Sequence, residues 1–312
     1  MRDITEKNVT LRTATAEASV FFSDATLQLI RRGELPKGDP FGFAKAAAFL
    51  GAKQTAYLIP HCHPIPLEAL DVQFELFDAG ADPARNGQAG MRIVATGKTI
   101  ARTGLEMEVL TAVSVAALTI YDLLKPVDVD LRIGDMRLTE KTGGKSDRRL
   151  RVDAGTTAAV LVISDSTAAG RREDRAGRSV RDLLEKLGVQ VVHYSIVPDD
   201  EQAIRTAVKR WVDEDIHFIF CAGGTGFGPQ DVTVEALRPI LEKEGPGIAE
   251  TMRRYGMDRT PVAMLSRSLA GSIGHSAVLA LPGSTAGATE SVHAVLPALF
   301  HMRRMLVGGG HE

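Results

Sequence analysis

Residues 105–122 read LEMEVLTAVSVAALTIYD. Apolar residues dominate this run at helical spacing, which predicts one long core helix over residues 107–125. Two carboxylates stand near its start, Glu106 and Glu108, and Asp122 and Lys125 stand near its end. An unpaired buried charge is very costly, so charges in such a helix are usually paired or used. The stretch therefore predicts both a core element and a chemical site.

The segments around this helix indicate an α+β domain. Residues 69–76 and 91–98 alternate apolar and polar side chains, which predicts two half-buried antiparallel strands. Residues 78–90 contain Gly, Asp, Pro and Asn and predict an extended hairpin loop. Further helices are expected over 24–32 and 40–52. Strands with helices packed on one face are typical of the α+β class.

The second half of the chain has a different pattern. Continuous apolar strands are expected to alternate with helices, the strands at 158–164, 190–197, 217–221 and 277–281, and the helices at 175–188, 200–213, 233–243 and 286–307. This order predicts an α/β, doubly wound, mostly parallel sheet with helices on both faces. Ligands of such sheets bind past the carboxyl ends of the strands. We predict domains at 1–146 and 158–312, joined by a linker at 147–157.

Composition excludes several classes of protein. The 312 residues suit two domains, and 37 basic against 39 acidic residues argue against an extended nucleic-acid surface. The two cysteines lie in different halves, so we expect no disulfide and a reducing compartment. The polar amino-terminal residues are unlike a signal peptide, and no apolar run reaches the ~18 residues of a membrane span. We therefore expect a cytoplasmic protein with no membrane and no nucleic-acid partner.

The first half contains basic residues in or near turns, namely Arg12, Lys37, Lys53 and Lys141. Each of these could simply be a solvated surface cation. The run EKTGGKS at 140–146 is more specific, because paired glycines expose backbone N–H groups beside lysines, a plausible phosphate grip. It lacks the spacing of a P-loop.

His61, Cys62 and His63 suggest a metal site, because both histidines would share one face of a strand. Further ligands at suitable spacing are missing. An acid/base or substrate contact by His63 fits better. Asp122 and Lys125 share a helical face, where they form either a structural ion pair or a pair poised for proton transfer.

These segments resemble the cyclic pyranopterin monophosphate synthase family across residues 1–146. The resemblance rests on MRDI (1–4), LIPHCHP (58–64), TGLEME (103–108), YD (121–122) and EKTGGKS (140–146). It implies a ferredoxin-like α+β fold, a hexamer, and a site shared between subunits. It also implies conversion of a cyclised GTP derivative to cyclic pyranopterin monophosphate and diphosphate, without a tightly bound cofactor. His61, where an apolar residue is usual, and the long 78–90 loop depart from the pattern.

The resemblance assigns roles to particular residues. Asp122 and Lys125 are the implied catalytic pair. The implied substrate-binding residues are Arg12, Lys37, Lys53, His63, Glu106, Met107, Glu108 and Lys141.

In the second half, polar residues follow three of the expected strands. Ser164 and Asp165 end the first, Asp199 follows a later one, and CAGGTGFGPQDVT (221–233) follows a third. Glycine backbone groups there can approach an anion, and Asp199 and Asp231 could hold a divalent cation that bridges phosphates. Glycine turns and aspartate helix caps are, however, also routine in α/β folds.

These motifs resemble the molybdopterin adenylyltransferase family across 158–306, with DRAG (174–177), PGIAE (246–250), LSR (265–267) and LPGS (281–284) as further matches. The implied reaction transfers AMP from Mg-ATP to molybdopterin. Asp199 and Asp231 are the implied catalytic acids and Mg²⁺ ligands. The implied binding residues are Ser164, Asp165, Gly223, Gly224, Thr225 and Ser266. Residues 285–287 read TAG where the family usually has Pro and often Lys, and some family members lack adenylylation activity.

The sequence thus predicts a bifunctional enzyme of molybdenum cofactor synthesis that acts on small molecules and assembles as a homotrimer or hexamer. One alternative is an active first domain fused to an inert, pterin-binding second domain. Another is an RNA- or nucleotide-binding protein that uses the basic residues Lys141, Lys145, Arg148, Arg149 and Arg151. Balanced charge and the lack of aromatic stacking motifs count against RNA.

Overall fold

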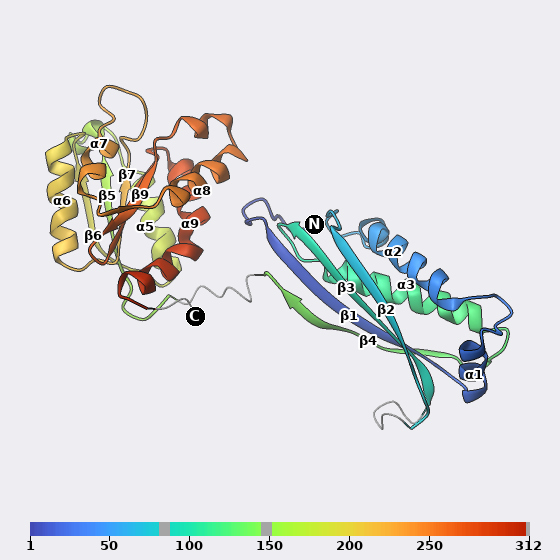
Figure 1. Cartoon of the computed structure of the whole chain (residues 1–312). Helices are drawn as coiled ribbons and strands as arrows, with labels where there is room; N and C mark the ends of the chain where they lie inside the picture. Colours follow the sequence, from blue (N-terminus) through green and yellow to red (C-terminus); the bar gives the residue numbers. More distant parts are fainter. Residues whose placement is uncertain (81–87, 145–151, 310–312) are drawn as a thin grey trace. The chain divides into compact units, whose positions relative to one another are not determined.

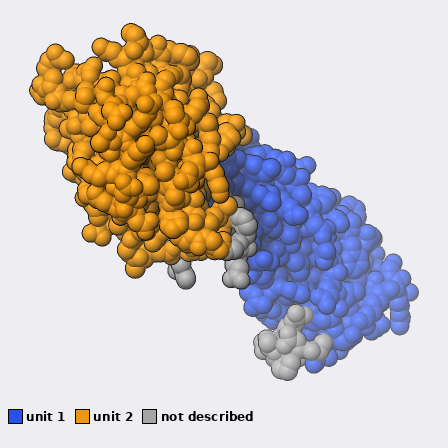
Figure 2. Space-filling model, turned by 60° about the vertical axis from the view of Figure 1, so that its left-hand side comes forward, with its two compact units in different colours: residues 1–149 blue, residues 150–312 orange. Residues whose placement is uncertain are grey.

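The computed structural model describes residues 1–80, 88–144 and 152–309. The chain divides into two units, Met1–Arg149 and Leu150–Glu312, each folded around its own core (Figure 1, Figure 2). The chain immediately before the second unit's first strand already packs on that unit. Arg303 donates a hydrogen bond to Thr156 (2.7 Å), and Arg304 lies 3.5 Å from the Asp153 carboxylate.

Unit 1 has a four-stranded sheet with helices on one face (Figure 1). Its elements are β1 (Thr10–Phe22), α1 (Asp24–Arg32), α2 (Pro40–Leu58), β2 (Ala69–Phe77), β3 (Ala89–Ala101), α3 (Glu106–Leu124) and β4 (Arg132–Thr142). The strand order is β2-β3-β1-β4, and every neighbouring pair is antiparallel. The helices and strands expected for this half are present, and α2 extends six residues beyond the predicted end, to Leu58.

The core of unit 1 lies between the sheet and the helices α2 and α3. Alternate residues of β1 from Ala14 to Val20 are fully buried against the helices. Gly51 of α2 lies so close to α3 that an added Cβ would come within 2.9 Å of Val115. By length and composition α3 could cross a membrane, and 56% of its apolar window is buried inside the unit. Core packing therefore accounts for its apolar sequence.

Unit 2 is built on a six-stranded sheet of order β6-β5-β7-β10-β9-β8. Its strands are β5 (Thr157–Ile163), β6 (Gln190–Val197), β7 (Phe218–Ala222), β8 (Lys243–Glu244), β9 (Leu269–Ile273) and β10 (Ser276–Leu281). Its helices are α4 (Asp165–Ala168), α5 (Ala176–Lys186), α6 (Glu201–Asp213), α7 (Thr233–Leu237), α8 (Pro246–Met257) and α9 (Thr285–Leu306), with 3₁₀ turns at Arg238–Ile240 and Pro261–Leu265. The four strands from β6 to β10 pair in parallel, and β9 and β8 complete the sheet antiparallel.

Both faces of this sheet are covered, as predicted. Side chains of β5 alternate between two apolar clusters, one under α5, α8 and α9 and the other under α6 and α7. The helix predicted over 233–243 is wrong at its end, because α7 stops at Leu237. Pro239 cannot donate the next helical hydrogen bond, and the chain tightens into a 3₁₀ turn there.

Candidate functional site

Glu106 and Glu108 both lie at the amino-terminal end of α3, but in different environments. Glu106 lies on the surface side, with its Oε1 3.4 Å from Lys141 Nζ. Glu108 is 4% exposed, and its Oε1 accepts a hydrogen bond from the Cys62 thiol at 3.6 Å. Burial raises the pKa of Glu108, and burial together with the neighbouring carboxylate raises the pKa of Cys62 to about 11. The thiol therefore stays protonated, and Glu108 holds its own proton more readily than an exposed glutamate.

A cavity of 240 Å³ opens beside this end of α3. It is lined by Arg2, Lys7, Arg12, Thr13, Arg102, Thr103, Gly104, Glu106, Lys141, Thr142 and Gly144. Five of these side chains are cationic and one is acidic, so the cavity suits a polyanion. We call it the basic cavity.

The glycine–lysine run of β4 forms one wall of the basic cavity. Gly143 has φ +84°, and an added Cβ would lie 1.9 Å from the Leu11 carbonyl oxygen. Thr10 Oγ1 also donates a hydrogen bond to the Gly143 carbonyl at 3.0 Å. Any side chain at this position would collide with the start of β1, so only glycine fits. Lys141, Thr142 and Gly144 of the predicted phosphate-binding run thus line a cavity rich in positive charge. Lys145 and Ser146 of the same run lie outside the described residues.

His63 lies next to the amino-terminal segment of the chain. Its Nε2 is 2.8 Å from the Arg2 carbonyl oxygen. A carbonyl can only accept, so Nε2 donates and the Nδ1 of a neutral ring is the basic nitrogen. Residues 62–68 form no strand, so the shared strand face invoked for His61 and His63 does not exist. In the described part of the chain, no group of three or more His, Cys, Asp or Glu side chains is placed to hold a metal.

The other end of α3 carries the predicted acid–lysine pair. Lys125 Nζ lies 2.7 Å from Asp122 Oδ1, and Lys37 Nζ donates to Asp122 Oδ2 (2.9 Å) and to its carbonyl oxygen (2.8 Å). The two ammonium groups lower the pKa of Asp122 to about 2, and the carboxylate raises the pKa of Lys125. Asp122 is therefore charged, and Lys125 is a protonated acid held in place.

One copy of the chain does not gather all these residues. Glu106 and Asp122 are sixteen residues apart on one helix, about 24 Å along its axis. Lys53 is exposed on α2, and Met107 is 39% exposed. Neither joins a cluster of the described residues, and the structure divides the remaining predicted residues of unit 1 between two half-sites. One is the basic cavity with His63 and Glu108, and the other is Lys37, Asp122 and Lys125.

In unit 2 the predicted residues converge past the carboxyl ends of β5, β6 and β7. Asp165 and Asp199 interlock: the Asp199 N–H donates to Asp165 Oδ1 (3.0 Å), and the Asp165 N–H donates to Asp199 Oδ2 (2.8 Å). Burial raises the pKa of Asp199, and the charges of Asp165 and Asp231 add to that rise. A cation here would relieve this repulsion.

Asp231 supports the glycine loop after β7. Its Oδ2 accepts a hydrogen bond from the Gly228 N–H at 2.7 Å. The N-cap position of α7 is Val232, which makes no side-chain capping bond, so the alternative that Asp231 is a helix cap is wrong. Ser164 does cap α4, by accepting from the Thr167 N–H at 3.4 Å.

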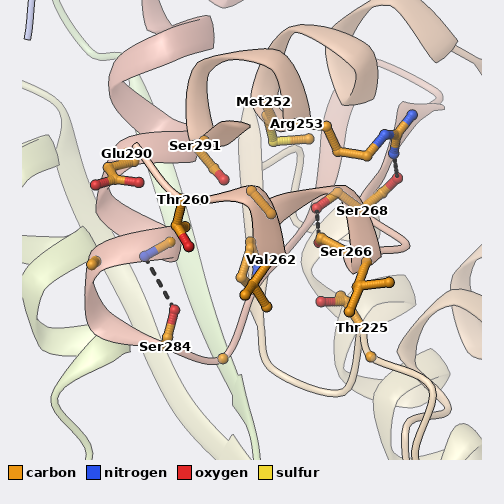
Figure 3. Close-up of a pocket in the computed structure, with 18 of the residues that line it drawn as sticks. Thr225, Met252, Arg253, Thr260, Val262, Ser266, Ser268, Ser284, Glu290 and Ser291 are labelled. Carbon is orange, nitrogen blue, oxygen red and sulfur yellow. Dashed lines mark hydrogen bonds between the residues drawn. The ribbon is translucent and has the colours of Figure 1, made fainter. Parts of the chain in front are cut away.

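Two cavities meet at this edge of the sheet. The first, of 380 Å³, contains Ser164, Asp199, Gly223, Arg172 and Arg175. The second, of 600 Å³, is largely apolar and is lined by Thr225, Met252, Val262 and Ser266 among others (Figure 3). They share four lining residues, Gly224, Asp231, Gly283 and Ser284. Asp231 and Ser284 are therefore accessible from both cavities.

Comparisons with known proteins identify both units. The MoaC family matches residues 1–144, and a family described as a probable molybdopterin binding domain matches residues 159–301. A molybdenum cofactor biosynthesis bifunctional protein of Chlorobaculum tepidum is 42% identical over 311 residues, covering 100% of this chain and 96% of the relative. The chain belongs to this bifunctional family.

Other members and single-domain relatives are similar to the chain. The molybdenum cofactor biosynthesis bifunctional protein of Synechococcus elongatus is 36% identical, across 100% of this chain and 98% of the relative. A cyclic pyranopterin monophosphate synthase of Rhodopirellula baltica is 46% identical, across 47% of this chain and 84% of that protein. The crystal structure of the molybdopterin biosynthesis enzyme MoaB from Thermus thermophilus is 39% identical, with 50% of this chain and 99% of that chain covered and a TM-score of 0.47.

Membership of the molybdenum cofactor biosynthesis family confirms the sequence-based identification of both halves. Several cavity-lining residues of this bifunctional chain were not among the predicted ones, namely Arg2, Lys7, Arg102, Arg172, Arg175, Arg253 and Ser284. For Arg175 a signal existed, because it lies in the DRAG motif. Arg2 and Ser284 likewise lie in quoted motifs, MRDI and LPGS, whereas Lys7 carried no such signal, because nothing local in the sequence joins it to β4.

Proposed function

We propose that unit 1 converts a cyclised GTP derivative to cyclic pyranopterin monophosphate and diphosphate, at a site assembled from two copies of the chain. The observation that supports this most is the placement of the two half-sites at opposite ends of α3. Neither half-site alone combines the basic cavity with the Lys125 ammonium group, which Asp122 keeps in place. Two copies packed with their α2–α3 layers antiparallel would bring Asp122 and Lys125 of one copy to the basic cavity of the other.

An exposed apolar stripe on the helical layer supports this assembly. Phe43, Leu50 and Tyr57 of α2 are 60%, 61% and 86% exposed, and their seven-residue spacing puts them on one helix face. On α3, Leu118 is 61% exposed. A surface of this kind is usually covered by a partner. Three such pairs around one axis would make the predicted hexamer. The split β-α-β arrangement of unit 1 further supports the predicted ferredoxin-like fold.

In this proposal the chain's residues have distinct roles. Arg12 and Lys141 bind phosphate oxygens and stabilise the diphosphate leaving group. Lys125 Nζ, kept protonated and in place by Asp122, delivers or retrieves a proton at the reacting ring. Glu108 is buried and does not line the basic cavity; by accepting from the Cys62 thiol it would hold the segment that carries His63.

Mixing of inactive variants tests the shared site. Lys125→Ala and Lys141→Ala each remove one lysine, from opposite half-sites. Refolded together, they should regain about a quarter of wild-type turnover, because half of the dimers are mixed and each has one intact site. Lys37→Ala mixed with Lys125→Ala is the matched control and should regain nothing, since both lie in the same half-site. Equal recovery in both mixtures, or in neither, would show that the site is not shared.

We further propose that unit 2 transfers AMP from ATP to the phosphate of molybdopterin. The two cavities separated by a common wall support this, since the reaction joins two ligands. The molybdopterin phosphate oxygen would attack the α-phosphorus of ATP, and diphosphate would leave. Arg172 and Arg175 would bind the phosphates, and Ser284 and the glycine backbone would orient them.

The acidic residues of unit 2 fit a magnesium ion that arrives with ATP. Mg²⁺ is commonly bound by one or two carboxylates together with substrate phosphates. Asp199 and Asp231 supply that number, and Asp231 uses only one carboxylate oxygen to hold Gly228. When bound, the ion would neutralise charge that develops on the phosphates.

An inert, pterin-binding unit 2 is the second candidate. It is favoured by residues 285–287, which read TAG where the resembled family usually has Pro and often Lys, next to Ser284 of the cavity wall. Labelled AMP transfer with authentic molybdopterin and Mg-ATP decides between them. Transfer that Asp199→Asn removes supports the enzyme, whereas pterin binding without transfer by the wild type supports the inert domain.

A further inference from the structure

The segment before β1 has a defined conformation beside the basic cavity. Asp3 Oδ1 accepts hydrogen bonds from the Thr5 N–H and from Thr5 Oγ1, both at 2.8 Å. The Lys7 N–H donates to the Ile4 carbonyl at 3.1 Å. These three bonds fold residues 3–7 into a compact turn, so the chain on either side of it has a fixed direction.

This turn directs two cations to the same cavity. Arg2 precedes it and Lys7 ends it, and both line the basic cavity together with Arg12, Arg102 and Lys141. These five residues come from four places in the sequence: the segment itself, β1, the turn before α3, and β4. The amino-terminal segment therefore supplies two of five positive charges.

The same segment also contacts the candidate acid/base residue. The Arg2 carbonyl oxygen lies 2.8 Å from His63 Nε2 and can only accept. This contact keeps a proton on Nε2 and holds the ring in one orientation. The segment that brings Arg2 and Lys7 to the cavity thus also orients His63.

We propose that residues 2–7 form a clamp for the polyphosphate end of the substrate. Arg2 and Lys7 bind phosphate oxygens, and the Arg2 carbonyl aligns His63 once the segment is in place. The proposal rests on the function proposed for unit 1, and it adds a phosphate-binding element. A chain of three phosphates can contact cations on both sides of the cavity, so inorganic triphosphate should bind more tightly than diphosphate, and diphosphate more tightly than phosphate.

Titration calorimetry of the full chain with inorganic triphosphate tests the charges. Arg2→Ala and Lys7→Ala should each weaken binding by about fivefold, a typical effect for a partly exposed charge contact. Arg32→Ala removes an exposed cation at the end of α1 and is the matched control, with unchanged affinity expected. Added salt should reduce the differences between variants. Equal affinities of all three variants and wild type, or no triphosphate binding by the wild type, would refute the clamp.

Two substitutions at Asp3 test the fold of the segment separately from its charge. Asp3→Ala and Asp3→Asn remove the same negative charge, but asparagine keeps an oxygen that can accept from the Thr5 N–H. If the turn positions the clamp, Asp3→Ala binds triphosphate less tightly than Asp3→Asn, and the ¹⁵N signals of His63 show loss of the proton preference for Nε2. If only overall charge matters, both variants bind more tightly than wild type, and the clamp is refuted.

Failure of the clamp can be distinguished from failure of the proposed reaction. Turnover of the cyclised GTP derivative by the wild type, with triphosphate binding unaffected by Arg2→Ala and Lys7→Ala, removes the clamp alone. Triphosphate binding that depends on Arg2 and Lys7, without turnover, removes the reaction and leaves a phosphate-binding device.

Discussion

Substitution of Gly143 by alanine should disturb the basic cavity by a predictable amount. The residue has φ +84°, a backbone conformation that costs a non-glycine residue ~1–2 kcal/mol. Its new Cβ would also start 1.9 Å from the Leu11 carbonyl oxygen, where real contacts are almost never under 3.0 Å. β4 must therefore move away from β1, an overpacking that costs a further ~1–3 kcal/mol. We expect unit 1 to lose ~2–5 kcal/mol of stability and to bind triphosphate more weakly.

Gly33→Ala separates backbone strain from this clash. Gly33 ends α1 with φ +69°, and an added Cβ would have no atom within 4 Å, so the loss should be only the backbone cost of ~1–2 kcal/mol. Urea unfolding followed in two ways measures both variants. Trp211 is the chain's single tryptophan and is buried in unit 2, whereas circular dichroism reports both units. The dichroism transition should shift for Gly143→Ala while the Trp211 transition stays in place. Equal shifts for Gly33→Ala and Gly143→Ala would refute the argument from close approach.

Three further predictions concern the charged sites. Lys125→Ala should lower formation of cyclic pyranopterin monophosphate by about 10²–10⁴-fold with an unchanged dichroism spectrum, and turnover within about threefold of wild type would remove Lys125 from the mechanism. Asp231→Asn can still accept from the Gly228 N–H but loses its charge, so AMP transfer should fall by about 10²-fold while the melting temperature stays the same; unchanged transfer would exclude Asp231 as a cation ligand. Burial raises the pKa of Glu17, but hydrogen bonds and charges from Arg92 and Arg137 lower it further, to below its usual 4.5. The stabilisation by the Glu17 carboxylate is therefore present above pH 4.5 and is lost as the pH falls through the lower folded-state pKa. In Glu17→Gln, the free energy of unfolding measured in urea at several pH values should fall less steeply with acid.

Local patterns predicted much of the fold. The alternation of residues 91–98 and the apolar run at 158–164 correctly placed β3 and β5, because each reflects which faces of a strand are buried. The spacing of Asp122 and Lys125 predicted their contact, since helix geometry alone brings residues three apart together. In unit 2, strand order alone predicts a common edge, and Asp165 and Asp199 do meet there.

Other features depend on contacts between distant segments. The approach of Gly143 to Leu11 follows from the pairing of β1 and β4 across more than a hundred residues. Arg2 meets His63, which is 61 residues away in the sequence, and no local pattern links the two. The placement of Glu106 and Asp122 at opposite ends of α3 could have been deduced from the length of the predicted helix. The end of α7 at Leu237 could have been foreseen from Pro239.

The wall between the two cavities of unit 2 has a consequence for inhibitors. An added Cβ on Gly283 would lie 3.3 Å from the Gly223 Cα, so main chain, without side chains, forms this part of the partition. Resistance mutations at Gly283 are constrained, because a new side chain there would press on the Gly223 main chain. A molecule that reaches from the apolar 600 Å³ cavity into the 380 Å³ one would gain affinity from tethering its two halves. Mutations would be least able to remove the contacts that such a molecule makes with the main chain of Gly223 and Gly283.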